Sequence, residues 1–181
     1  MAFVVVDVET TGLGHVASPP REDAVLQVGM AWREKGLVKT WSDYCNPGRK
    51  FISNGRAEDA LGINGISLQT IERSRAASAV AKDFWERVEA IEQTAGEATF
   101  LAYNRSFDEG FLNQKPWSVP RGKWGDCIMR TAAYHLTGNS RLKLQRAMQM
   151  FSIPWPGTRG HDAAFDAHAA LLVHEKINGL K

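Results

Sequence analysis

The stretch FVVVDVETTGLG, residues 3–14, decides the fold class of this 181-residue chain. It opens with four apolar residues, mostly β-branched, which is typical of a buried strand. The run ends at Asp7 and Glu9, and a Thr-Thr-Gly sequence follows them. Because side chains alternate along a strand, both carboxylates face the same way and repel each other unless a cation lies between them. An exposed acidic turn and a metal site both fit this pattern, and the rest of the chain has to distinguish them.

Predicted elements along the rest of the chain favour an α/β fold. Strands at 24–33 and 37–45, joined by the short loop Glu34-Lys35-Gly36, form an antiparallel meander with the first strand. Further elements are a strand at 99–103 and helices at 80–95, 106 onward, 127–136, 142–151 and 163–177. Residues 46–67 are rich in Gly, Asn and Pro and predict a long loop. Since helices fall after and between strands, a single α/β domain over residues 1–181 is expected.

The composition excludes several classes of protein. The chain has 44% hydrophobic and 23% charged residues and a formal net charge of +2, as ordinary globular proteins have. Cys45 and Cys127 are too few and too far apart for a disulfide scaffold or a cysteine-based zinc site. No apolar run approaches the roughly 18 residues of a membrane helix, so a cytoplasmic protein without membrane contact is expected. A nucleic-acid partner would have to meet a local basic patch.

Two later segments place further acids near the ends of predicted elements. Asp108 falls in the first turn of the helix after strand 99–103, near the sheet edge where α/β proteins hold ligands; alternatively, it only favours the helix dipole. Asp166 lies in the last predicted helix, and His161 precedes that helix behind a glycine-flanked loop. A lone histidine is more often a surface or core residue, which is our interpretation of the other four histidines. His161 differs because Gly160 gives it a flexible approach to a site that Asp166 also reaches.

Together, three segments resemble the three motifs of the DEDDh exonucleases, the DnaQ-like 3′→5′ exonucleases that include the proofreading epsilon subunit and ribonuclease T. They are DVETTGL at 7–13, YNRSFD at 103–108 and HDAAFD at 161–166. NGIS at 64–67 and RLKLQRAMQMFSI at 141–153 are similar to two further segments of the family. The resemblance covers nearly the whole chain, and three motifs in the expected order are a far more specific signal than DxETTG alone.

The resemblance implies a ribonuclease H-like fold: a five-stranded mixed sheet flanked by helices, with an antiparallel meander followed by parallel strands. It also implies two Mg²⁺ ions, for which Mn²⁺ substitutes. Carried over residue by residue, Asp7, Glu9 and Asp166 hold one ion, and Asp7 holds the other together with Asp108, which binds it directly or through water. His161 is then the general base that accepts a proton from the attacking water near neutral pH.

The resemblance also implies three substrate-binding residues. Thr11 is similar to a position that contacts the terminal nucleotide, Leu13 to an apolar wedge against its base, and Asn104 to an Asn near the second motif. Leu13 as a core residue and Asn104 as a turn residue are the structural alternatives. In residues 115–126, tryptophans interleave with Lys and Arg, a pattern that suits single strands, but rings that anchor a long loop explain it better. Phe107 is expected in the core.

The expected function is hydrolysis of single-stranded DNA from its 3′ end, with release of nucleoside 5′-monophosphates. An exoribonuclease or oligonucleotide-degrading enzyme of the same fold is the alternative, although Thr10 stands where oligoribonucleases usually have Met. A catalytically inactive nucleic-acid-binding module is disfavoured because all five motif residues are present. A homodimer is left open, and no tether to a polymerase is expected because the chain ends soon after the last motif. Gln27, where many relatives carry Glu, predicts no catalytic consequence.

Overall fold

A central strand, β1, organises the sheet of this protein. The computed structural model describes residues 1–14, 23–155 and 161–179, and within these ranges six strands form one sheet in the order β4-β3-β2-β1-β5-β6. The strands are β1 (Ala2–Thr10), β2 (Val25–Glu34), β3 (Leu37–Asn46), β4 (Arg75–Ala76), β5 (Ala98–Ala102) and β6 (Trp124–Cys127). β1 to β3 form an antiparallel meander, whereas β5 pairs parallel with β1 and β6 pairs parallel with β5. The predicted mixed sheet, with its meander followed by parallel strands, is therefore confirmed.

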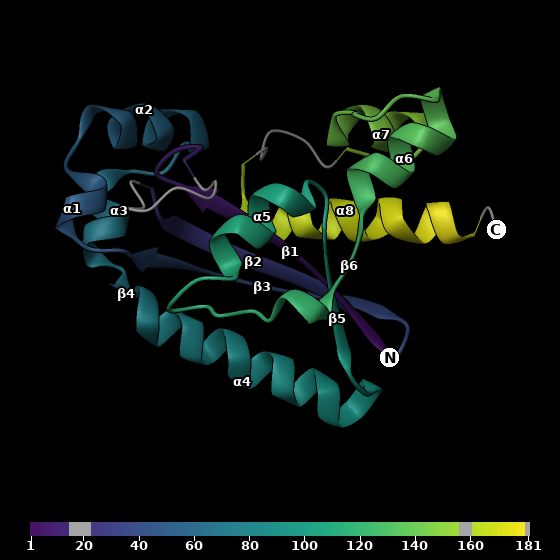
Figure 1. Cartoon of the computed structure of the whole chain (residues 1–181), viewed down its shortest axis with the longest axis horizontal. Coiled ribbons are helices and arrows are strands. Elements are labelled where there is room, and N and C mark those ends of the chain that lie inside the picture. Colours follow the sequence, from purple (N-terminus) through teal and green to yellow (C-terminus); the bar gives the residue numbers. More distant parts are fainter. Residues whose placement is uncertain (15–22, 156–160, 180–181) are drawn as a thin grey trace.

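Helices cover both faces of this sheet (Figure 1). They are α1 (Arg49–Ile52), α2 (Gly55–Asn64), α3 (Leu68–Arg73), α4 (Ala77–Ala95), α5 (Arg105–Leu112), α6 (Ile128–Thr137), α7 (Leu144–Met150) and α8 (Ala163–Asn178), with a short 3-10 helix, η1 (Arg121–Lys123). The long helix α4 packs on one face, and α6, α7 and α8 pack on the other. α2 and α5 lie near the end of β1 where the first motif begins. α2 and α5 therefore flank the part of β1 that carries the first motif.

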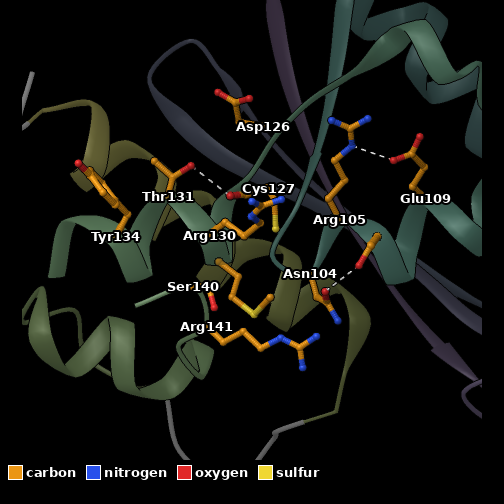
Figure 2. A pocket seen from close by; sticks show the side chains of 12 residues that line it. Asn104, Arg105, Glu109, Asp126, Cys127, Arg130, Thr131, Tyr134, Ser140 and Arg141 are labelled. Carbon is orange, nitrogen blue, oxygen red and sulfur yellow. Dashed lines mark hydrogen bonds and ion pairs between the residues drawn. The ribbon is translucent and has the colours of Figure 1, made fainter. Parts of the chain in front are cut away.

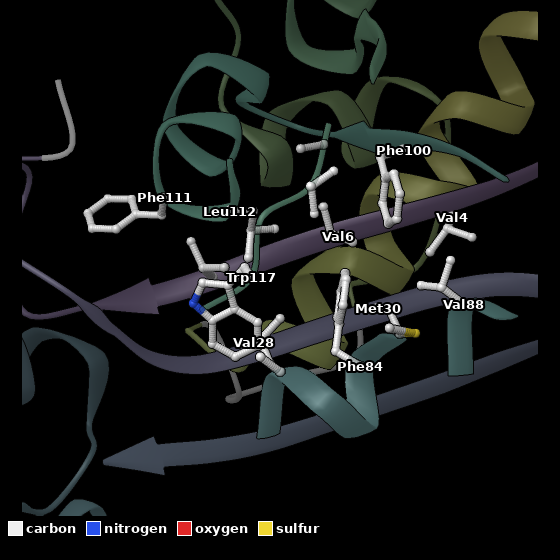
Figure 3. Packing of buried hydrophobic residues seen from close by; sticks show 14 of the residues in the cluster. Val4, Val6, Val28, Met30, Phe84, Val88, Phe100, Phe111, Leu112 and Trp117 are labelled. Atoms are coloured by element: carbon white, nitrogen blue, oxygen red, sulfur yellow. The ribbon is translucent and has the colours of Figure 1, made fainter. Parts of the chain in front are cut away.

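The alternation of side chains along β1 divides the core into two clusters. Val4 and Val6 are fully buried in the cluster beneath α4 (Figure 3), where the Phe84 ring stacks on Phe100 with centroids 5.9 Å apart. Val5 belongs to the opposite cluster, beneath α8. Burying one such side chain contributes about 1.5–3 kcal/mol, so the two clusters fix the direction in which each residue of β1 points.

Residues 46–67 depart from the prediction. They contain α1 and α2, and the loop prediction is wrong. The Asn54 side chain caps α2 by accepting the Ala57 N–H at 3.0 Å, and Gly65 ends the helix with a left-handed φ of 64°. The Asn and Gly residues that predict a loop are thus the boundaries of short helices. Beyond this region and α3, β4 adds a two-residue parallel edge strand to the five that were expected.

From the sequence, Asp162 is expected to cap the helix at 163–177, and Ser106 with Glu109 is expected to form a capping box at the helix that begins at 106. At α8, the Asp162 Oδ1 atom accepts the Phe165 N–H at 3.1 Å, so the predicted cap is confirmed. At α5, the predicted pairing of Ser106 with Glu109 as a capping box is wrong. The helix begins one residue earlier, and Glu109 instead accepts a hydrogen bond from Arg105 Nε at 2.8 Å. An ion pair one turn apart has replaced the cap.

Candidate metal centre and active site

Asp7 and Glu9 share the face of β1 on which Val5 packs beneath α8. In the antiparallel register, Asp7 lies opposite Gly29 of β2, and Glu9 lies opposite Gln27. Glu9 is only 7% exposed and Asp7 is half-buried. The two carboxylates therefore stand on a covered surface of the sheet, and the exposed acidic turn does not describe them.

The first turn of α8 lies directly against these strands. A Cβ atom on Gly29 would overlap the backbone of Ala163, so glycine is what lets α8 approach the sheet at this point. The Gln27 amide holds the same turn, because its Oε1 accepts the Ala163 N–H at 3.2 Å and its Nε2 donates to Asp162 Oδ2 at 3.3 Å. Gln27 thus positions the helix that carries Asp166.

Asp166 and His161 meet Glu9 at the start of α8. One ligand atom from each of the three residues lies within 4.8 Å of the others. His161 has a left-handed φ of 66°, a conformation that is uncommon outside glycine and often marks a functional site. The Asp166 Oδ1 atom is buried and has no hydrogen-bond partner among the described residues. Leaving such an atom without a partner costs about 1–3 kcal/mol unless a ligand supplies one.

Asp108 reaches the same place from α5. The pairing of β5 with β1 ends at Leu101 and Val5, before the motif acids. Beyond that point the Asp108 Oδ1 atom accepts the Val8 N–H at 3.2 Å, and Asp108 is only 2% exposed. The carboxylate thus satisfies a buried backbone donor of β1 and is held next to Asp7.

Burial and neighbouring like charges raise the pKa values of all four acids. Burial, and then the charge of Asp108, raise the pKa of Asp7 well above its usual range, with further contributions from Asp166 and Glu9. Burial and the charge of Asp166 raise the pKa of Glu9 to about 8. Burial raises the pKa of Asp166 to about 6, against an opposing effect of His161. The pKa of Asp108 is also raised by burial. Desolvation and like charge therefore act together on one cluster.

These side chains fit a divalent cation. Mg²⁺ and Mn²⁺ prefer carboxylate oxygens, which this cluster supplies in excess. Within the described ranges, no Lys or Arg forms an ion pair with any of the four acids. In this part of the chain the repulsion is opposed only in part, by backbone N–H groups at Asp108 and by His161 at Asp166. A bound cation would relieve it and would give the Asp166 Oδ1 atom a partner.

Comparison with known proteins matches most of the chain to a family. A family model described as exonuclease, RNase T, matches residues 4–174. The chain belongs to the RNase T exonuclease family. The DEDDh resemblance predicted from the three motifs is thereby confirmed, and with it membership of a family of 3′-5′ exonucleases.

Curated relatives of this RNase T family chain are longer proteins. The 3′-5′ exonuclease DinG of Bacillus subtilis (strain 168) is 32% identical over 114 residues, which cover 61% of this chain and 10% of DinG. The DNA polymerase III subunit epsilon of Buchnera aphidicola subsp. Schizaphis graminum (strain Sg) is 28% identical over 115 residues, which cover 62% of this chain and 44% of that protein. The match thus spans less than half the length of either relative.

Solved structures share the fold of the RNase T family chain. A full-length 3′-exonuclease superposes with a TM-score of 0.75 at 16% identity, covering 99% of this chain and 60% of that one. The nuclease domain of 3′hExo, a DEDDh family member bound to rAMP, gives 0.69 at 14% identity, covering 99% and 91%. At such identities the likeness establishes the ribonuclease H-like DEDDh fold and nothing finer.

A cleft of about 550 Å³ opens beside the acids. Glu9 and His161 line it on the side of the metal centre, and the strongly exposed side chains of Leu13 and Ile63, 79% and 68% exposed, line it farther out. Leu13 is therefore no core residue, and its position fits the predicted contact with a nucleobase. Phe107 packs against the core as predicted, but it is only half-buried and also lines the cleft.

The turn after β1 is held by a residue that sequence reasoning missed. Asp23 is 3% exposed and accepts the Gly14 N–H at 2.7 Å and the Thr11 hydroxyl at 3.4 Å. Thr11 is fully buried, and its Oγ1 also accepts the Ala24 N–H at 2.9 Å. The Thr11 side chain thus faces the protein, and its predicted nucleotide contact stays a prediction. Only the position of Asp23 just before β2 could have indicated this role.

The remaining predicted contacts do not line the cleft beside the acids. Asn104 is exposed, and its Oδ1 accepts the Ser106 hydroxyl at 3.3 Å. Trp117 and Trp124 are 2% and 8% exposed, which confirms that they anchor the 115–126 segment in the core. None of the helices in the described part of the chain combines the length and the apolar composition that a bilayer crossing requires.

Proposed function

We propose that this protein is a metal-dependent 3′-5′ exonuclease that hydrolyses single-stranded DNA and releases nucleoside 5′-monophosphates. One observation carries the proposal: Glu9, His161 and Asp166 bring ligand atoms within 4.8 Å of one another, at a cluster that Asp7 and Asp108 complete. In an exonuclease of this family, such a cluster is the natural place for phosphodiester hydrolysis. The same geometry would have no evident use in a module that only binds nucleic acid.

The resemblance to the DEDDh exonucleases implies the roles of the acids, and their clustering supports those roles. Asp7, Glu9 and Asp166 would hold one Mg²⁺ ion, and Asp7 with Asp108 would hold a second. When bound, such ions polarise the phosphate and stabilise the attacking and leaving oxygens of an in-line displacement. Burial and neighbouring like charges raise the pKa values of the acids, and cations at this site would favour their charged forms.

His161 supplies the group that moves a proton. Its imidazole is exposed at the mouth of the cleft, where water and a terminal phosphate can reach it. The ligand atoms of Asp166 and His161 lie within 4.8 Å of each other, so a carboxylate stands beside the ring that would take the proton. We assign His161 the role of general base toward the attacking water.

The choice of DNA rests on the relatives. DinG is named a 3′-5′ exonuclease, and the epsilon subunit belongs to a DNA polymerase. An exoribonuclease is the second candidate, because one of the solved structures of this fold is described as a 3′-exonuclease that recognises a histone mRNA stem-loop. The sequence relatives favour DNA because they share more residues with this chain than those structures do.

Digestion of labelled oligonucleotides tests the proposal. Single-stranded DNA and RNA of the same sequence, each with a 5′ label, are incubated with Mg²⁺, Mn²⁺ or EDTA. We expect a ladder that shortens from the 3′ end with either metal, faster on DNA, and no products in EDTA. The released product should co-migrate with nucleoside 5′-monophosphates.

A matched pair of variants distinguishes cleavage at this site from cleavage by a contaminating nuclease. Asp7→Asn removes one metal-binding charge and should reduce turnover by at least about a thousandfold, with no loss of metal-free melting temperature. Glu89→Gln makes the same chemical change on the exposed surface of α4 and should leave the rate unchanged. Binding of DNA without cleavage in both metals would contradict the proposal, as would an unchanged rate in Asp7→Asn.

A further inference from the structure

A second hollow, of about 860 Å³, lies between α5 and α6 (Figure 2), and its lining shares no residue with that of the cleft beside the acids. Its wall carries three arginines, Arg105 from α5, Arg130 from α6 and Arg141 from the segment before α7. Tyr134 of α6 also lines it and is 73% exposed. We call this hollow the arginine groove. An exposed aromatic ring among cations is the combination that holds single-stranded nucleic acid.

The charge of the arginine groove comes mainly from two side chains. Arg105 is engaged, because its Nε atom forms an ion pair with Glu109 at 2.8 Å. Arg130 and Arg141 are exposed, and neither forms an ion pair or hydrogen bond within the described ranges. Asp126 is the other acid that lines the groove. Two unengaged guanidinium groups against one carboxylate leave a net positive surface that suits phosphates.

The arginine groove connects to the active site through a third hollow. That hollow shares Asn104, Ser106 and Arg141 with the groove, and it shares Phe107 with the acidic cleft. The next residue after Phe107 is the buried Asp108 of the metal centre. A chain whose end lies at the acids can therefore continue over the start of α5 and into the arginine groove.

We infer that the arginine groove binds the nucleotides upstream of the 3′ end, with Arg130 and Arg141 on phosphates and Tyr134 against a base. This inference rests on the proposed function for the direction of the strand, because only the 3′ end is placed at the acids. It makes the enzyme a nuclease for extended single strands, which bind along the groove and leave it as they are shortened. A strand too short to reach Arg141 gains nothing from it.

An acidic protein segment is the competing occupant of a cationic groove. The connection with the cleft through Phe107 favours the nucleic acid, because the two hollows then share one ligand. Tyr134 points to the same choice, since an exposed ring stacks on bases and has no comparable partner in a run of Glu or Asp side chains.

Salt dependence of binding provides the sharpest test. Binding of a 5′-fluorescein-labelled single strand of about 20 nucleotides is followed by anisotropy in EDTA, from about 50 to 200 mM NaCl. For single strands the slope of log K against log salt is about −0.7 for each neutralised phosphate. The double variant Arg130→Ala/Arg141→Ala should therefore lose about 1.4 of the wild-type slope. Tyr134→Ala should weaken binding about fivefold or more with the slope unchanged.

A control variant removes the same charge elsewhere. Lys82→Ala/Lys176→Ala changes two exposed cations on α4 and α8 and should keep the wild-type slope. An unaltered slope in the arginine variant, or an equal loss in the lysine variant, overturns the inference. Tighter binding of labelled oligoglutamate than of the oligonucleotide overturns it as well and assigns the groove to a protein.

The cleavage assay tests the proposed function and the binding assay tests the groove, so either proposal can be refuted without the other. A wild type that binds the labelled strand with the predicted loss of slope in the arginine variant, yet cleaves nothing in Mg²⁺ or Mn²⁺, refutes the proposed function and supports the groove. A wild type that cleaves normally while the arginine variant keeps its slope refutes the groove alone. In an active enzyme, the ratio of kcat/KM for the long strand to that for a dinucleotide should fall about tenfold in the arginine variant.

Discussion

Gly29 of β2 and Ala163 of α8 pack backbone against backbone, with no room for a side chain between them. Gly29 is also the residue that lies opposite Asp7 in the sheet. The contact sets the distance between β1 and the helix that carries Asp166. The approach of Asp166 to Asp7 and Glu9 therefore depends on one missing methyl group.

Gly29→Ala should weaken both the fold and the site. The added Cβ forces α8 away from the sheet, and overpacking of this kind typically costs about 1–3 kcal/mol. For a chain of this size we expect the melting temperature to fall by roughly 3–10 °C, with a larger proportional loss of kcat. Thermal unfolding and steady-state rates measure the two effects. Gly62→Ala is the control, because nothing lies near its position on α2; an equal loss in both variants would contradict the argument.

Metal-free protein should become less stable as the pH rises. The folded-state pKa of Glu9 is raised from 4.5 to about 8, and that of Asp166 from 3.8 to about 6. Between these values the folded state binds more protons than the unfolded state, so the free energy of unfolding falls with rising pH. We expect the melting temperature in EDTA to drop by several degrees from about pH 5 to pH 8.

Adding Mg²⁺ or Mn²⁺ should reverse that trend. Cations bind the ionised acids, so the gain in melting temperature should be largest near pH 8 and small near pH 5. Differential scanning fluorimetry with and without metal at both pH values measures it. A metal-free protein that is most stable at pH 8, or a gain that is equal at both pH values, would argue against a shared cation site for Glu9 and Asp166.

His161→Asn should remove the base and keep the backbone. Asn tolerates the left-handed conformation that His161 adopts, so the turn before α8 can persist without the imidazole. General-base catalysis contributes about 10²–10⁴-fold, and kcat should fall within that range while the melting temperature changes little. His174→Asn makes the same change at the far end of α8 and serves as the control. Retention of most of the rate in His161→Asn would rule out the proposed base.

Asp23→Asn should loosen the turn that presents Leu13 to the cleft. The substitution turns one acceptor oxygen into a donor, facing either the Gly14 N–H or the Thr11 hydroxyl. Losing one such hydrogen bond costs about 1 kcal/mol, so we expect KM to rise about fivefold with kcat reduced less. Kinetics on single-stranded DNA measure the change. A loss confined to kcat would assign Asp23 to the chemistry instead of to the turn.

Local rules account for what the sequence could predict. The face shared by Asp7 and Glu9 follows from the period of a strand, and the Asp162 cap follows from the side chain that precedes α8. What the sequence could not predict depends on tertiary contacts. Neither Asp23 nor Phe107 differs in local pattern from an ordinary loop acid or a core aromatic, and only folding brings both to the cleft.

Residues 46–67 are a segment in which the local sequence pattern gave the wrong secondary structure. Gly and Asn signal a turn or a helix boundary with equal strength, and short helices such as α2 contain few apolar residues to show a period. Only Ala57 and Leu61 of α2 are buried, and Asn54 and Gly65 mark the two ends of the helix. The helix then contributes Ile63 to the cleft, where a predicted loop had suggested no fixed surface.

The odd–even division of β1 has a consequence for how this protein can change. Odd positions 5, 7 and 9 belong to the helix-α8 side and even positions 4, 6 and 8 to the α4 side. Insertion or deletion of a single residue early in the strand would turn both acids into the hydrophobic cluster beneath α4. It would also place valines where the proposed substrate phosphate binds. The strand can therefore vary in the identity of its aliphatic residues, but its length up to Glu9 is fixed.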